Sequence, residues 1–67
     1  MEGYMFYDII YGERNIEYAT GAINTLEDAK KEFKNLVKDK YDYVILRRID
    51  YDLFNEEITI ITEHHRK

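Results

Sequence analysis

The sequence predicts an α+β fold in which one helix lies across one face of a four-stranded, mostly antiparallel sheet. Two observations lead to this fold class. One segment, 25–38, has the spacing of an amphipathic helix, and the segments 4–11, 15–20, 43–50 and 57–63 are typical of strands. The order strand, strand, helix, strand, strand favours a two-layer ββαββ architecture.

The helix is the clearest of these elements. Apolar residues recur at three-and-four spacing from Leu26 to Val37, with Phe33 at the centre of the stripe. Thr25 is placed to cap the N-terminus, with Asp28 three residues later. Because a helix of about 13 residues is marginal alone, it must pack on the sheet.

The first two strands are expected to form a hairpin with Gly12 in its turn. The odd-numbered residues from Met5 to Tyr11 share one face with Ile16 and Tyr18, and we expect the helix to cover that face. A two-residue loop beginning at Gly12 sets Asp8 opposite Glu17, and facing like charges destabilise a strand pair. We therefore prefer a four-residue loop from Gly12. Both registers keep the same residues on the same face.

The first strand is expected inside the sheet, beside the second strand and either the third or the fourth. The third strand has apolar residues on both faces in its first half, which indicates burial on both sides. We expect its second half, Arg47 to Asp50, to emerge into solvent. The chain from His64 onward is expected to be a frayed tail.

The face of the first strand that the helix leaves open carries Phe6, Asp8 and Ile10. Aliphatic residues of the third and fourth strands are expected to join it. A contiguous apolar patch on a surface usually marks an interface. We therefore predict that Phe6, Asp8 and Ile10 contact a protein partner, with a twofold homodimer as the commonest case. The alternative is that loops cover these residues.

The turn after the third strand combines carboxylates with large apolar side chains: Asp50, Asp52, Leu53, Phe54, Glu56 and Glu57. We expect Leu53 and Phe54 to fold back over the open end of the core. The alternative is a contact loop, in which all six residues bind a protein whose surface is basic.

Residue types that carry catalysis are scarce. The 67 residues, expected to form a single small domain over 1–67, include no cysteine and no serine, and the three glycines are isolated. His64 and His65 are adjacent on a strand, so they point to opposite faces and do not share a zinc ion. We predict no catalytic residue, no cofactor and no metal site.

Charge and hydropathy bound the location and the partner. No apolar run approaches a membrane span, and the N-terminal residues lack the pattern of a secretory signal, so we expect a cytoplasmic protein with no membrane contact. The net charge of −4 disfavours binding to nucleic acid.

The predicted function is that of a small acidic, non-catalytic module that binds a protein with a basic surface. A sharper hypothesis is a phage or mobile-element inhibitor that mimics DNA in the nucleic-acid site of a host enzyme, such as a CRISPR effector, a restriction enzyme or a repair enzyme. Two alternatives stay open. One is a sheet that binds nucleic acid by tyrosine stacking, and the other is a homodimeric structural or regulatory subunit.

Overall fold

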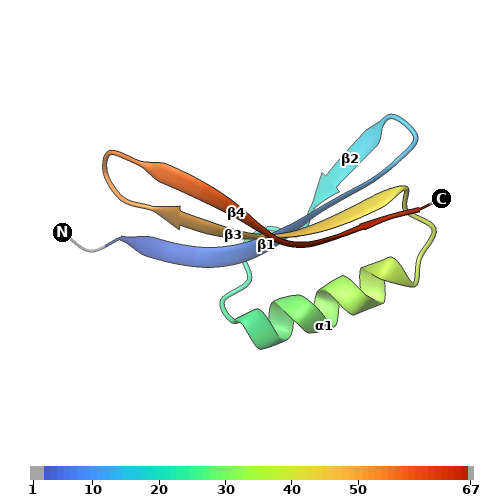
Figure 1. Cartoon of the computed structure of the whole chain (residues 1–67), viewed down its shortest axis with the longest axis horizontal. Helices are drawn as coiled ribbons and strands as arrows, with labels where there is room; N and C mark the ends of the chain where they lie inside the picture. Colours follow the sequence, from blue (N-terminus) through green and yellow to red (C-terminus); the bar gives the residue numbers. More distant parts are fainter. Residues whose placement is uncertain (1–2, 67) are drawn as a thin grey trace.

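The computed structural model describes residues 3–66 and confirms the predicted ββαββ order. The elements are β1 (Tyr4–Glu13), β2 (Ile16–Ala19), α1 (Leu26–Val37), β3 (Tyr43–Tyr51) and β4 (Glu56–His65). The strands form one antiparallel sheet in the order β2-β1-β3-β4, and α1 lies against one face (Figure 1). β1 is inside the sheet as predicted, with β3 as its second neighbour.

The helix begins as its sequence indicates, since the Thr25 hydroxyl accepts the Asp28 N–H at 3.1 Å. Ala29 and Leu36 are buried, whereas Phe33, the expected centre of the stripe, packs on the core and stays partly exposed. Because the Ala29 side chain is small, α1 approaches the sheet closely at this residue. The helix residues that are buried most deeply therefore lie along one edge of the apolar stripe. Within the described chain, no helix combines the length and apolarity needed to cross a membrane.

The sheet surface under α1, which we call the helix face, carries the odd-numbered residues of β1, as predicted. The expectation that the helix covers the whole face is wrong, since Met5, Ile16 and Tyr18 are 43%, 57% and 40% exposed. They lie towards the ends of the sheet, which bend away from α1 (Figure 1). Ile9 lies opposite Leu46, and Tyr11 lies opposite Val44. Tyr7 completes the buried centre of this face. Burying these apolar side chains against α1 is the main source of stability that the fold contains.

The β1–β2 hairpin turns later than expected, because its two-residue loop is Arg14-Asn15 and β1 continues to Glu13. Both predicted loops beginning at Gly12 are therefore wrong, although the predicted face assignment is correct. In the observed register the rings of Tyr11 and Tyr18 stack with centroids 5.3 Å apart on the helix face. Arg14 adopts a φ of 59°, the left-handed conformation that such a short loop demands.

Two expectations for the second hairpin are also wrong. Ile49 is buried rather than solvated, because Phe6 of β1 and Ile58 of β4 flank it on either side. His64 and His65 belong to β4 rather than to a frayed tail, since they pair with the first residues of β3.

We predict that Leu36→Ala lowers the free energy of unfolding by about 2–5 kcal/mol, because it leaves a cavity between α1 and the sheet. Phe33→Ala should cost less, since the ring remains partly in water in the folded chain. Urea unfolding followed by circular dichroism measures both. A larger loss for Phe33→Ala than for Leu36→Ala would mean that the helix presents a different side to the sheet.

Candidate functional site

The sheet surface opposite α1, which we call the open face, is lined mostly by apolar side chains. β1 contributes Phe6 and Ile10, β3 contributes Ile45 and Ile49, and β4 contributes Ile58 and Ile60. Ile58 and Ile60 are 48% and 52% exposed, and no segment within residues 3–66 lies over this surface. The expectation that aliphatic residues of β3 and β4 join Phe6 and Ile10 is confirmed.

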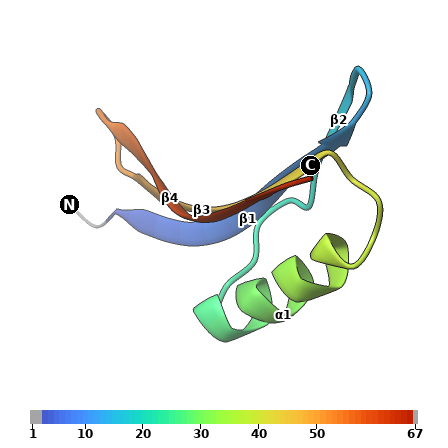
Figure 2. The same cartoon turned by 45° about the vertical axis from the view of Figure 1, so that its right-hand side comes forward.

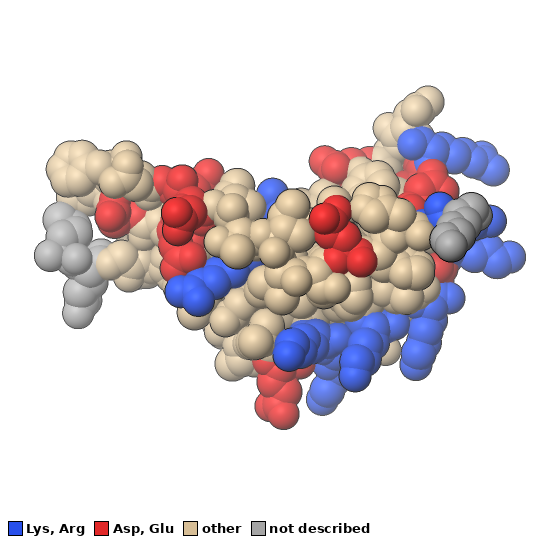
Figure 3. Space-filling view, in the orientation of Figure 1, with Lys and Arg blue, Asp and Glu red and all other residues tan. Residues whose placement is uncertain are grey.

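The open face is hollowed. Both ends of the sheet, the β1–β2 hairpin and the β3–β4 hairpin, bend away from α1 (Figures 1 and 2). The space-filling view shows the resulting hollow between two raised ends (Figure 3). An apolar concave surface of this kind fits a convex element of a partner.

An ion pair lies in the middle of the open face. Asp8 pairs with Arg47 across β1 and β3, and the carboxylate accepts hydrogen bonds from Nε at 2.9 Å and from Nη2 at 2.7 Å. The Asp8 side chain is 11% exposed and that of Arg47 26%. The hydrogen bonds from Arg47 to the carboxylate raise the pKa of Arg47 above its ordinary value. Each ion neutralises the charge of the other, so the open face carries no net charge at this point.

Gly12 lies within β1 and not in the turn, and it leaves room for a side chain on the open face. It lies opposite Tyr43, and a Cβ at Gly12 would come within 2.6–2.8 Å of the tyrosine ring. The ring crosses the glycine, and its hydroxyl donates to Glu17 Oε1 on β2 at 2.6 Å. That hydrogen bond is the main cause of the raised pKa of Tyr43. Tyr43 thereby ties β3 to β2 across β1.

Aromatic rings close the other end of the open face. Tyr4 and Tyr51 face each other at the start of β1 and the end of β3, and their rings stack with centroids 5.5 Å apart. Phe6 meets Tyr51 edge-on at 6.0 Å. Tyr4 is 67% exposed, so this aromatic group is available for contact.

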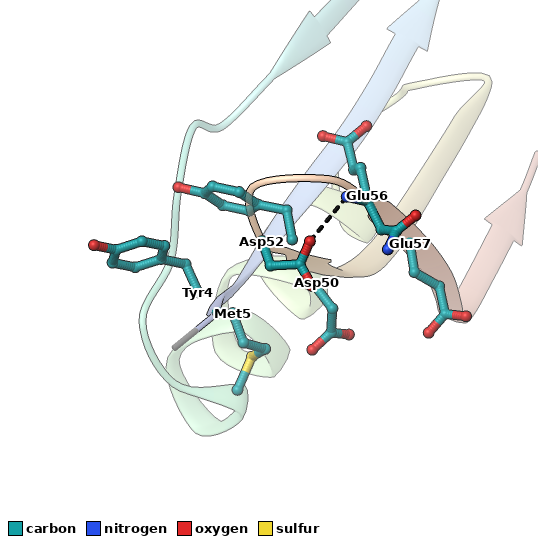
Figure 4. Close-up of a pocket in the computed structure, with 9 residues that line it drawn as sticks. Tyr4, Met5, Asp50, Asp52, Glu56 and Glu57 are labelled. Atoms are coloured by element: carbon teal, nitrogen blue, oxygen red, sulfur yellow. Dashed lines mark hydrogen bonds between the residues drawn. The ribbon is translucent and has the colours of Figure 1, made fainter. Parts of the chain in front are cut away.

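An open pocket of about 610 Å³ adjoins these rings where the β3–β4 loop turns (Figure 4). Its lining includes Tyr4, Met5, Asp50, Asp52, Glu56 and Glu57. Two of the carboxylates are engaged within the chain. Asp50 pairs with Arg48 at 2.9 Å, and Asp52 accepts the N–H groups of Phe54 and Asn55 at 2.8 and 2.9 Å. The two backbone donors lower the pKa of Asp52.

Leu53 and Phe54 project from the tip of this loop. Their exposed fractions are 71% and 86%, so the expectation that they fold back over the core is wrong. The carboxylate of Asp52 holds the tight loop, and a four-residue connection is too short to return two large side chains to the sheet. Their placement fits the alternative of a contact loop.

The predicted site residues therefore fall into two neighbouring groups. Phe6, Asp8 and Ile10 lie on the open face, while Asp50, Asp52, Glu56 and Glu57 surround the pocket at its end. Sequence reasoning named neither Arg47 nor the isoleucines Ile45, Ile49, Ile58 and Ile60 as site residues. The alternation of isoleucines in β3 and β4 is the signal that marks the latter.

Other chemistry is sparse in the described part of the chain. No group of three or more potential metal ligands occurs within residues 3–66. His64 pairs with Val44 on the helix face, and His65 pairs with Tyr43 on the open face, where its ring lies 3.0 Å from a Glu63 oxygen.

Comparison of the chain with protein-family models, with curated proteins and with solved structures finds no match.

We predict that Asp8→Ala destabilises the fold by about 1–2 kcal/mol, because it strands the Arg47 guanidinium among isoleucines while its partial exposure limits the cost. The double variant Asp8→Leu with Arg47→Met should regain most of that loss, since apolar side chains of similar size replace both ions. Urea unfolding of the parent, the single variants Asp8→Leu and Arg47→Met, and the double variant completes a double-mutant cycle and measures the coupling. Additive effects would show that the two residues do not interact.

Proposed function

We propose that this chain is a non-catalytic module that binds another protein through the open face. The observation that carries the proposal is the apolar hollow of the sheet, which α1 does not cover. Neighbouring exposed isoleucines such as Ile58 and Ile60 on a concave surface are typical of a binding role. The exposed tip residues Leu53 and Phe54 extend the same surface.

The charges around the open face define the chemistry of the partner. Glu17, Glu56 and Glu63 occupy open-face positions, while Arg47 is neutralised by Asp8. The lysines of α1 gather on the side away from the hollow in Figure 3. A partner with an apolar ridge flanked by basic side chains complements this arrangement, and its association would be faster at low salt.

A basic surface of that kind is typical of a site that binds nucleic acid, because such sites neutralise phosphates. The inhibitor hypothesis is a specific form of the proposal. In it, the carboxylates at the end of the sheet take the place of phosphates in the site of a host enzyme, and the protein acts in the host cytoplasm. Its support is the exposed acidic rim of the pocket beside the open face.

The test places the same charged residue on opposite faces of the sheet. Phe6→Asp places a charge in the open face, whereas Ile16→Asp places one on an exposed position of the helix face, where Ile16 is 57% exposed. Parent and variant chains, immobilised at neutral pH, capture proteins from an extract of the native host. We expect one set of proteins to be retained by the parent and by Ile16→Asp and lost with Phe6→Asp.

Circular dichroism of both variants provides the control, because an unfolded bait loses every partner. Retention of the same proteins by Phe6→Asp would contradict the proposal. Adding DNA or RNA oligonucleotides to the retained complex tests the inhibitor form, which predicts that they compete for the captured protein. If oligonucleotides do not displace the captured protein, protein binding stands and the inhibitor hypothesis is wrong.

A further inference from the structure

The outer edge of β4 is the longest free strand edge in the described structure. β4 is the last strand of the sheet, and every one of its residues is exposed. The opposite margin of the sheet is protected. β2 is only four residues long, and beyond it Tyr7 and Ile9 of β1 are hydrogen-bonded by Ile23 and Thr20. A long free edge presents unpaired N–H and C=O groups to another strand.

The charges of β4 are arranged with opposite character at its two ends. Glu56 and Glu57 begin the strand, while His64 and His65 end it and Arg66 follows. Parallel pairing of two copies sets like ends together. Antiparallel pairing sets each acidic end against the histidines of the other copy, and it does so twice across a twofold axis.

The bulge in β4 selects the register of such a pairing. Leu46 pairs with Thr62 and Arg47 with Ile60, so Ile61 is an extra residue in β4. In a strand without a bulge, residues equally distant from the 60–61 step point to opposite faces. In β4 the extra residue shifts the alternation by one, so residues equally distant from the 60–61 step point to the same face.

The β3 residue opposite each β4 residue shows on which face that β4 residue lies. Thr59 and Thr62 both oppose helix-face residues, and Ile58 and Glu63 both oppose open-face residues. Further from the step, Glu57 and His64 both lie on the helix face, and Glu56 and His65 both lie on the open face. Antiparallel pairing about a twofold axis perpendicular to the sheet requires that paired residues lie on the same face, because that axis does not exchange the two faces.

We propose that two copies of this chain pair through β4, antiparallel and centred on the 60–61 step. Thr59 of one copy then lies opposite Thr62 of the other, and Glu56 and Glu57 lie opposite His65 and His64. An imidazole N–H donates to a carboxylate in either protonation state of the ring, so the end contacts form at neutral pH. The product is an eight-stranded sheet with both helices on one side and two open faces side by side.

This inference stands apart from the proposed partner, because it concerns purified protein and a backbone edge. Its first test is sedimentation of the parent over a concentration series, for which we expect a monomer–dimer equilibrium. His64→Glu with His65→Glu should weaken dimerisation about tenfold or more, since four like-charge pairs then face each other. A parent that stays monomeric throughout the series overturns the proposal.

The matched variant, Glu56→Lys with Glu57→Lys, makes the test specific. Mixed with the histidine variant, it brings lysines opposite glutamates at one end and restores the parental pairs at the other. We expect the mixture to form dimers more strongly than either variant alone. Dimers that are indifferent to both variants and to mixing would place self-association elsewhere, for instance on the open face.

Single cysteines then fix the register, because the sequence has none of its own. A mixture of Thr59→Cys and Thr62→Cys chains, equilibrated in a glutathione buffer, should give the mixed disulfide in preference to either symmetric one. Preference for a symmetric disulfide would contradict the proposed register. Neither outcome bears on whether the open face binds another protein.

Discussion

The pairing of β1 with β3 is the constraint on which the other parts of the structure depend. It joins residues that are between 31 and 47 positions apart, from Gly12 opposite Tyr43 to Tyr4 opposite Tyr51. Once it forms, each remaining element has one place. The helix packs on the side where Ile9 meets Leu46, and β2 and β4 are left as the two margins of the sheet.

The same pairing explains why the second face is apolar without being a core. A sheet has two surfaces, and one helix of twelve residues covers only one of them. The Asp8–Arg47 pair at the centre of the uncovered face adds little to stability by itself, because both ions lose water when they pair. It does oppose slippage, since a one-residue shift would leave two charges unpaired among isoleucines. We regard it as a device that fixes the register of β1 against β3.

Local pattern was sufficient for the order of the elements, for the start of the helix and for the two faces of β1. The spacing of α1, its Thr25 cap and the odd-numbered residues of β1 each depend on neighbours in sequence, and each prediction is confirmed. The hairpin register was not accessible in this way. Gly12 carries a strong turn signal, but it is needed where the Tyr43 ring crosses the strand, a contact 31 residues away in sequence.

The candidate site shows the same division. Phe6 and Ile10 could be assigned to an uncovered face from alternation alone. The pairing of Asp8 with Arg47 needs the strand order and the register together, so no local rule finds it. Leu53 and Phe54 were expected to cover the end of the core, yet Asp52 closes a short loop that leaves both side chains exposed.

The central claim is that the described chain leaves one face of its sheet open, and the methyl groups of its isoleucines test it most directly. Selective ¹³C labelling and a soluble paramagnetic agent report the exposure of each methyl in dilute solution. We expect strong broadening for Ile58 and Ile60 on the open face, and protection for Ile9, which is fully buried under α1. Protection of Ile58 and Ile60 equal to that of Ile9, in a sample shown to be monomeric, would contradict the claim that this face is free to bind.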